Sequence, residues 1–284
     1  MARLDVPPPI VPIQMTVTVE ARHGKEVPVM KPGDIMVFQK NQRLAVTDLD
    51  ARTALELYIL IDDASSANLG SQFNDLKQFI ETQPTGTSIG VGYMRNGTVE
   101  FTQPLTADHS QAAKGLRLPM GYPGVMPSPY LSLSDLIRRW PASQARHEVI
   151  LVSSGIDPLD GGVVDPYLDA TIEHAQRAGV IVYSIYEPAA GHGGHSFWLM
   201  NWGQNHLAQI AEETGGECYM FGFEPLISFA PYLAEISEHL AHQYVVTFLA
   251  TPGNKSGFQS VRLTTEVPNA ELVHSGRVYV SAPH

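Results

Sequence analysis

Two largely apolar runs, each ending abruptly at polar residues, constrain the fold of this chain most strongly. Residues 54–61 read ALELYILI and are followed by two aspartates, and residues 147–152 read HEVILV and are followed by Ser-Ser-Gly. Strands that are apolar on both faces are typical of a parallel sheet with helices on both sides. The sequence therefore predicts a buried parallel sheet.

Segments with apolar residues at helical spacing alternate with further apolar strands. Helices are expected at residues 72–82, 130–140, 167–178, 206–214 and 227–242, and further strands at residues 87–94, 180–186, 217–221 and 244–250. This alternation predicts right-handed β-α-β crossovers. The expected fold class is α/β, with a doubly wound, mostly parallel, Rossmann-like sheet over residues 54–250.

The two ends of the chain have a different pattern. Residues 13–47 and residues 258–281 alternate apolar and polar positions in short runs separated by turns, which is typical of half-buried strands. We expect an N-terminal extended or β segment at residues 1–53 and C-terminal strands at residues 251–284. The two segments are predicted to pair as a small β appendage.

Charge and hydropathy exclude several classes of partner. The formal net charge is -11 and no Lys/Arg-rich run is present, which argues against a nucleic-acid partner. No apolar stretch approaches the ~20 residues of a membrane span, so no membrane insertion is expected. The N-terminus lacks the apolar segment of a signal peptide. Taken literally this means cytoplasm, but a chain whose leader has been removed would look identical.

The sequence contains no motif of a nucleotide-binding site or of a serine hydrolase. The turn after the first apolar strand has two carboxylates where a dinucleotide site needs a glycine-rich turn, and no Walker-type sequence is present. The sequence around Ser153 and Ser154 lacks the first glycine of a G-x-S-x-G elbow. We therefore expect no catalytic residues and no nucleotide cofactor.

Polar residues that follow the strands are where a doubly wound sheet binds its ligands. A D-x-A-x-S sequence follows the first strand, a Pro-Ser-Pro loop comes later, and Ser-Gly ends another strand. This layout resembles, in position and order, the metal-ion-dependent adhesion site of von Willebrand factor A domains over residues 54 to about 250. The flanking β segments look like the bacterial von Willebrand factor A-related subfamily. The matching positions are Asp62, Ala64, Ser66, Ser128 and Ser154.

This chain departs from the family pattern at two of these positions. Ala64 replaces a hydroxyl ligand, and Ser154 stands where the family has an aspartate. A hard divalent cation in a protein usually takes one or two carboxylates, and Asp62 alone is clearly placed to supply one. We expect a degenerate site with no metal, or with weakly bound Mg²⁺, Mn²⁺ or Ca²⁺. Its predicted ligands are Asp62, Ser66, Ser128 and Ser154.

Ordinary structural roles are open for the same residues. Asp62 is suited to accept hydrogen bonds from N–H groups of the following loop, and Ser66 to cap the next helix. Asp157 is placed either to approach the site or to act as a loop or capping residue. Asp63 should point away from Asp62 because side chains alternate along a strand.

The resemblance implies a non-enzymatic module for protein–protein interaction, adhesion or scaffolding, in a secreted or periplasmic location. Its face would be the loops after the strands, and the predicted partner-binding residues are Asp63, Ser65, Tyr122, Met126, Tyr130 and Asp157. The alternatives are a Rossmann-like hydrolase with an unrecognised active site and a structural module of a larger envelope assembly. The identity of the protein partner does not follow from the sequence.

One further segment combines histidines with aromatic residues. Residues 191–195 read GHGGH and, with His206 or Asp165, offer zinc ligands, although an exposed loop is the favoured interpretation. Residues 197–202 read FWLMNW, and we expect this cluster to be buried as a lid rather than exposed as an anchor.

Overall fold

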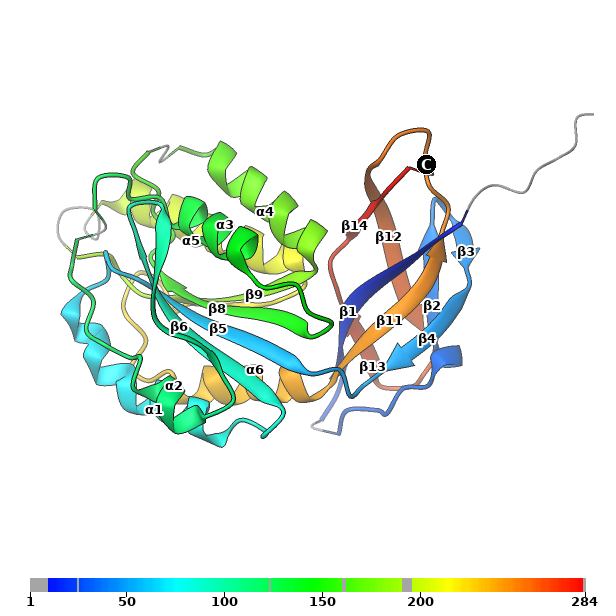
Figure 1. Cartoon of the computed structure of the whole chain (residues 1–284), viewed down its shortest axis with the longest axis horizontal. Coiled ribbons are helices and arrows are strands. Elements are labelled where there is room, and N and C mark those ends of the chain that lie inside the picture. The colour runs from blue at the N-terminus through cyan, green and yellow to red at the C-terminus, as the bar shows by residue number, and fades with distance from the viewer. Residues whose placement is uncertain (1–9, 25, 123, 160–161, 191–195, 283–284) are drawn as a thin grey trace, which may run out of the picture. The chain divides into compact units, whose positions relative to one another are not determined.

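A computed structural model describes residues 10–24, 26–122, 124–159, 162–190 and 196–282 of the chain. The chain divides into two compact units (Figure 1). The α/β unit comprises Thr53–Ala241, and the β unit combines Met1–Arg52 with His242–His284.

A six-stranded sheet forms the centre of the α/β unit, in the order β10-β9-β8-β5-β6-β7. All neighbouring pairs are parallel except β6 and β7, which form an antiparallel hairpin. This confirms the predicted doubly wound, mostly parallel sheet. The strands are β5 (Leu55–Asp62), β6 (Thr87–Arg95), β7 (Thr98–Thr106), β8 (Arg146–Ser153), β9 (Val180–Tyr186) and β10 (Cys218–Tyr219).

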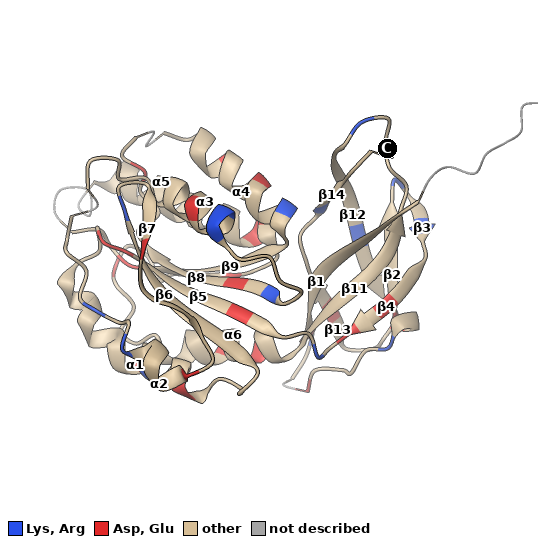
Figure 2. Ribbon diagram, viewed as in Figure 1, with Lys and Arg blue, Asp and Glu red and all other residues tan. Residues whose placement is uncertain are grey.

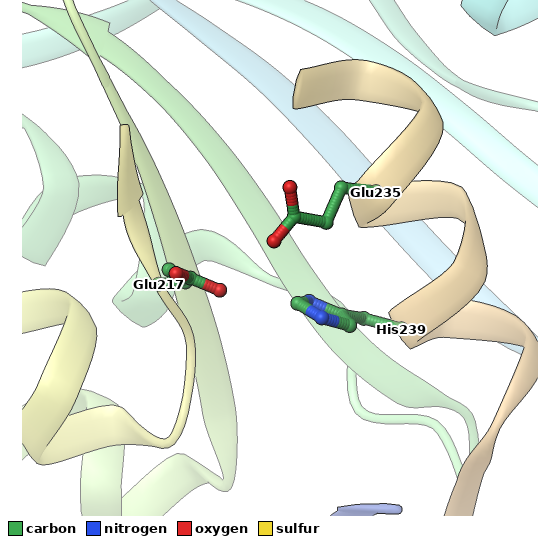
Figure 3. A group of neighbouring side chains, drawn as sticks. All are labelled: Glu217, Glu235 and His239. Atoms are coloured by element: carbon green, nitrogen blue, oxygen red, sulfur yellow. The ribbon is translucent and has the colours of Figure 1, made fainter. Parts of the chain in front are cut away.

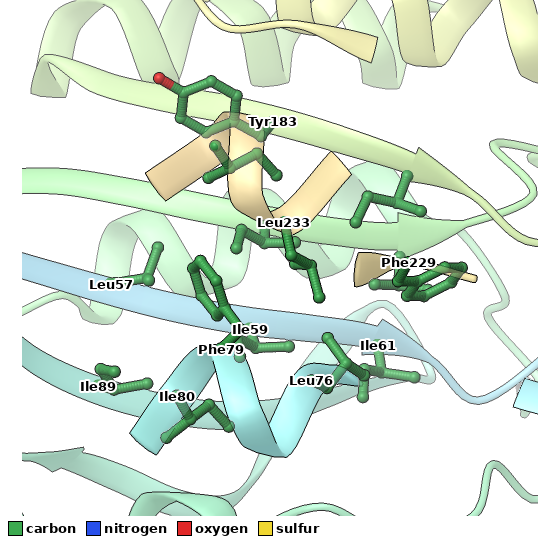
Figure 4. Packing of buried hydrophobic residues seen from close by; sticks show 14 of the residues in the cluster. Leu57, Ile59, Ile61, Leu76, Phe79, Ile80, Ile89, Tyr183, Phe229 and Leu233 are labelled. Atoms are coloured by element: carbon green, nitrogen blue, oxygen red, sulfur yellow. The ribbon is translucent and has the colours of Figure 1, made fainter. Parts of the chain in front are cut away.

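Helices cover both faces of this sheet because its strands are apolar on both faces (Figure 1). Leu57, Ile59 and Ile61 pack on one side with α1, α2 and α6 (Figure 4), and Tyr58 and Leu60 pack on the other with α3, α4 and α5. The helices are η2 (Ala67–Gln72), α1 (Phe73–Thr82), α2 (His109–Ala113), α3 (Pro129–Arg139), α4 (Pro166–Ala178), α5 (Phe197–Thr214) and α6 (Ala230–Ala241).

The direction of winding reverses between β5 and β8, which are neighbours in the sheet although β6 and β7 lie between them in sequence. In doubly wound folds, ligands bind outside the carboxyl ends of the strands at this reversal. Asp62 ends β5 and Ser153 ends β8, so the fold places both residues at the point where a site is expected.

Two antiparallel four-stranded sheets form the β unit, in the orders β13-β1-β11-β4 and β14-β12-β2-β3. They enclose a separate apolar core. Pairing of β12 with β2 and of β13 with β1 confirms that the N- and C-terminal segments form one β appendage. The elements are β1 (Val11–Ala21), η1 (Pro32–Asp34), β2 (Ile35–Gln39), β3 (Gln42–Leu44), β4 (Val46–Asp50), β11 (Gln243–Ala250), β12 (Gly257–Thr265), β13 (Ala270–Val273) and β14 (Arg277–Val280).

Two boundaries differ from those expected. The strand predicted at residues 244–250 to belong to the α/β domain is β11, which pairs with β1 and β4, so that domain ends at Ala241. The helix predicted to begin at His206 begins at Phe197, because the aromatic cluster of residues 197–202 has good helix formers at its centre and continues the helical pattern.

The described residues include no helix that is long and apolar enough to cross a membrane. Lysine and arginine are scattered over many elements of both units in the part of the chain that the structure describes (Figure 2). They do not form the continuous basic stripe that binds a nucleic-acid backbone.

Candidate functional site

Asp62 is the centre of the candidate site at the carboxyl edge of the sheet. Its Oδ1 accepts a hydrogen bond from the Ala64 N–H at 2.8 Å, and its Oδ2 accepts one from the Ser153 hydroxyl at 2.8 Å. The side chain is buried. Burial, with the nearby charges of Asp63 and Asp157, raises the pKa of Asp62 to about 6.

A second carboxylate, that of Asp157, reaches the same region from the loop after β8. The Ser128 hydroxyl donates a hydrogen bond to Asp157 Oδ2, and the Leu159 N–H donates one to Oδ1 at 2.8 Å. Ser128 also caps α3, because its Oγ accepts from the Leu131 N–H at 3.1 Å. Asp157 is therefore a loop residue bonded to the predicted metal ligand Ser128, and both side chains are buried.

The two remaining predicted metal ligands have structural roles. Ser66 Oγ accepts from the Asn68 N–H at 3.2 Å and caps η2, as the capping alternative predicted. Ser154 Oγ accepts from the Ile156 N–H at 3.3 Å, and the serine that contacts Asp62 is Ser153. Ser154 directly follows β8, and the last residue of that strand, Ser153, takes the position beside Asp62.

These contacts test whether the residues fit the divalent-metal site that the family resemblance implies. Both oxygens of Asp62 already accept hydrogen bonds, and the position of the second carboxylate is occupied by Ser154. The other nearby carboxylate, on Asp157, is bonded to Ser128. Since a hard cation of this class needs accessible oxygen ligands, the donor set does not fit that site.

Arg117 is a neighbour of the candidate site that sequence reasoning missed. Its guanidinium donates two hydrogen bonds to the fully buried Asp63 carboxylate, at 2.7 and 2.8 Å, and stacks over the Tyr93 ring with its central carbon 3.8 Å from the centroid. The pair raises the pKa of Arg117 through its hydrogen bonds to Asp63. The ion pair fastens the segment after α2 to the end of β5, where the Tyr122 N–H donates to the Asp63 carbonyl at 2.9 Å.

Only two of the six predicted partner-binding residues are exposed. Tyr122 and Met126 are 54% and 47% exposed. The other four are buried and contact other parts of the chain; Tyr130, at the start of α3, donates its hydroxyl proton to the Gly155 carbonyl at 2.9 Å. The buried residues are Asp63, Ser65, Tyr130 and Asp157.

The first two residues of the aromatic cluster at the start of α5 are also exposed, which corrects the expectation of a buried lid. Phe197 and Trp198 are 55% and 65% exposed. The Phe197 ring contacts Trp198 and Phe223 edge to face, with centroids 5.5 and 5.4 Å apart. The predicted glycine–histidine loop, residues 191–195, lies outside the described residues.

Glu187 directly follows β9 and is another buried carboxylate at this edge that the sequence analysis did not select. It is 2% exposed, and burial raises its pKa from 4.5 to about 7. An acidic residue immediately after a strand whose residues are apolar except for Ser184 was the signal available in the sequence.

The raised pKa predicts how stability depends on pH. Because the folded-state pKa exceeds the unfolded value, the contribution of Glu187 is complete below about pH 4.5 and is lost as the pH rises through about 7. The Glu187→Gln variant has no carboxyl group to ionise and therefore lacks this loss. The difference in free energy of unfolding, variant minus original, should be on the order of 2 kcal/mol larger at pH 8 than at pH 5. Urea unfolding of both proteins at the two pH values measures the difference. An equal difference at both pH values contradicts the prediction.

Comparison with known proteins identifies the fold of this chain. No protein-family model and no curated protein matches the sequence. Among solved structures, a von Willebrand factor type A protein from Catenulispora acidiphila matches 99% of this chain and 75% of its own, with 11% identity and a TM-score of 0.51. An aerotolerance-related membrane protein from Bacteroides fragilis covers 66% of this chain and 98% of its own, with 12% identity and a TM-score of 0.47. The match to the manganese-loaded TRAP protein of Plasmodium vivax covers 88% of this chain and 100% of the TRAP chain, with 14% identity and a TM-score of 0.45. With its sheet order and its helices on both faces, this chain has the von Willebrand factor A fold.

Proposed function

We propose that this chain is a non-enzymatic protein-binding module that uses the carboxyl edge of its six-stranded sheet and needs no divalent cation there. The observation that carries the proposal is the position of the exposed large apolar side chains. Among the described residues of the α/β unit, all of them lie in segments that meet at this edge: Leu118, Met120, Tyr122, Val125, Met126, Leu159, Val163, Val164, Phe197, Trp198, Phe221 and Ile227.

Hydrogen bonds connect the segments that bear these side chains to the ends of the strands. The Val125 N–H donates to Asn96 in the hairpin after β6, and the Ala190 N–H donates to the Ala64 carbonyl at 2.7 Å. Gln204 of α5 donates to the Gly222 carbonyl in the segment after β10. The apolar side chains therefore stand on loops held by the sheet rather than on free tails.

Exposed apolar and aromatic clusters of this kind mark protein-binding sites on soluble domains. Tyrosine and tryptophan are the residues most often found to dominate binding energy, together with arginine. The von Willebrand factor A fold supports the same interpretation, although a fold by itself does not define a function. The protein binding proposed here needs no metal ion on the buried carboxylates of Asp62 and Asp157.

Two variants test this face. Tyr122→Ser with Met126→Ser removes one part of it, and Phe197→Ser with Trp198→Ser removes another. Quantitative capture of partners from extracts of the source cells should fall about tenfold or more with each variant, the loss expected when central apolar side chains are truncated. Val29→Ser, which removes an 81% exposed apolar side chain from the β unit, is the matched control and should capture as much as the original protein.

Metal dependence is tested in the same experiment. Capture, and the midpoint of thermal unfolding, should be the same in EDTA and in excess Mg²⁺ or Mn²⁺ at fixed ionic strength. Capture that survives both double substitutions would exclude this face, and capture that is lost in EDTA would show a metal-bridged contact instead.

A further inference from the structure

A second group of ligand-bearing side chains lies beside β10, the edge strand of the sheet. Glu217 immediately precedes β10, and Glu235 and His239 belong to α6. One ligand atom of each residue lies within 4.8 Å of the ligand atoms of the other two. Figure 3 shows the two carboxylates and the imidazole directed toward one another.

The backbone fixes two sides of this group. Glu235 and His239 are four residues apart on one helix and therefore project from the same face. Glu217 is fixed from the other side, because its carbonyl accepts from the Ser184 N–H of β9 at 2.9 Å. A Cβ on the preceding Gly216 would overlap with the Val182 carbonyl oxygen, so the chain approaches β9 too closely for any residue but glycine.

The orientation of the imidazole is also restricted. The His239 ring stacks on the Tyr183 ring of β9, with centroids 6.0 Å apart and planes inclined by 28°. His239 is half-buried, whereas the two glutamates are exposed. One ring is thus held in place, and two flexible carboxylates have room to adjust around it.

Imidazole and carboxylate together are a donor set for zinc and its transition-metal neighbours, whereas Mg²⁺ and Ca²⁺ prefer oxygen alone. Ligands at ~2.0–2.2 Å in a tetrahedral arrangement are about 3.5 Å apart. Small rotations of the exposed glutamates reach that spacing from the one observed. Two carboxylates that face each other repel, and a bound cation converts that repulsion into attraction.

We propose that Glu217, Glu235 and His239 form a binding site for a divalent transition-metal ion of the zinc type, with water in the fourth position. The ion would join the edge strand β10 to α6. This site is separate from the protein-binding face, so either proposal can fail without the other.

The test uses the full chain without an affinity tag. Calorimetric titration with Zn²⁺ should show one site, and Zn²⁺ should raise the midpoint of thermal unfolding while Mg²⁺ at the same ionic strength does not. His239→Ala and, separately, Glu217→Gln should each weaken Zn²⁺ binding at least about tenfold. Titration with Co²⁺ should give the visible absorption of a tetrahedral complex, and His239→Ala should abolish it.

Two control variants locate the ion. His23→Ala removes an exposed histidine from the β unit, and Asp62→Asn removes the carboxylate at the carboxyl end of β5; both should bind Zn²⁺ as the original chain does. If Zn²⁺ does not bind at millimolar concentration, or binds equally well to His239→Ala, the proposal is wrong. Loss of binding in Asp62→Asn instead would place the ion at the carboxyl edge.

Discussion

Replacing Gly203 by alanine should destabilise the protein by about 4 kcal/mol, even though the same change inside a helix usually stabilises by about 1 kcal/mol. Gly203 lies within α5. A Cβ at this position would overlap with the Ser154 carbonyl oxygen and would lie 2.9 Å from the Ile156 nitrogen. The helix therefore contacts the loop after β8 through main chain on both sides.

Neither partner in this contact can move away by a change of side-chain rotamer. Gly155 in the loop has a φ of +69°, and a Cβ there would overlap with the Gly203 carbonyl oxygen. A shift of the loop would also strain the hydrogen bond from Tyr130 to the Gly155 carbonyl. The steric cost therefore outweighs the gain in helix propensity.

Urea unfolding of the Gly203→Ala variant measures the loss. Gly86→Ala is the matched control, because a Cβ there would meet no atom within 4 Å, and it should change stability by less than about 0.5 kcal/mol. A Gly203→Ala variant as stable as the control would mean that the helix and loop are not in close contact.

The α/β unit could be predicted from the sequence because its buried strands carry a strong local signal. Residues of β9 are buried on both faces throughout, and the apolar run ends at Glu187. The Asn96-Gly97 pair between β6 and β7 is a further local signal, because this dipeptide favours a tight hairpin turn, and both residues adopt positive φ, of 53° and 67°. Such features depend on a few neighbouring residues, and the sequence displays them directly.

The strand β11 was misassigned because its apolar residues resemble those of a buried parallel strand. In the structure its central and last residues alternate between buried and partly exposed, as expected for an antiparallel strand with one covered face. Its partners β1 and β4 lie nearly 200 residues or more away along the chain. Pairing over such a separation leaves no local pattern that favours one sheet over the other.

The same limit applies to the candidate site. Asp62 and Ser66 were predicted with their hydrogen-bonding roles, because each bonds a residue two positions away. The sequence left Asp157 open between two roles, because its contact with Ser128 depends on how two loops fold together. The ion pair of Asp63 with Arg117 joins residues 54 positions apart, so the sequence around either residue did not predict it.

After Gly203→Ala, removal of the ion pair between Asp63 and Arg117 should cause the largest loss of stability. Arg117→Met keeps an unbranched apolar side chain but removes both guanidinium donors, and the buried Asp63 carboxylate still accepts from the Met120 N–H at 3.3 Å. An uncompensated buried charge usually costs 3–5 kcal/mol, and because Arg117 is 26% exposed we expect about 3 kcal/mol. Urea unfolding at pH 7 measures this loss.

A second substitution separates the charge from the packing. Asp63→Asn added to Arg117→Met removes the buried charge, so the double variant should be more stable than Arg117→Met alone. Lys77→Met breaks an exposed ion pair with Glu81, 3.8 Å apart, and should cost less than about 0.5 kcal/mol. If Arg117→Met lowers the free energy of unfolding no more than Lys77→Met does, the ion pair with Arg117 does not stabilise the buried Asp63 carboxylate.

The consequence for binding can be followed at one amide. The Tyr122 N–H donates to the carbonyl of Asp63, so loss of the ion pair should loosen the segment that carries the exposed Tyr122 side chain. Hydrogen exchange at Tyr122 should then be faster in Arg117→Met than in Lys77→Met, and partner capture should fall with it. Faster exchange with unchanged capture would show that Arg117 stabilises the fold without positioning the binding face. Faster exchange together with reduced capture would show that the buried pair of Asp63 and Arg117 holds the apolar side chains of the loop in their binding arrangement.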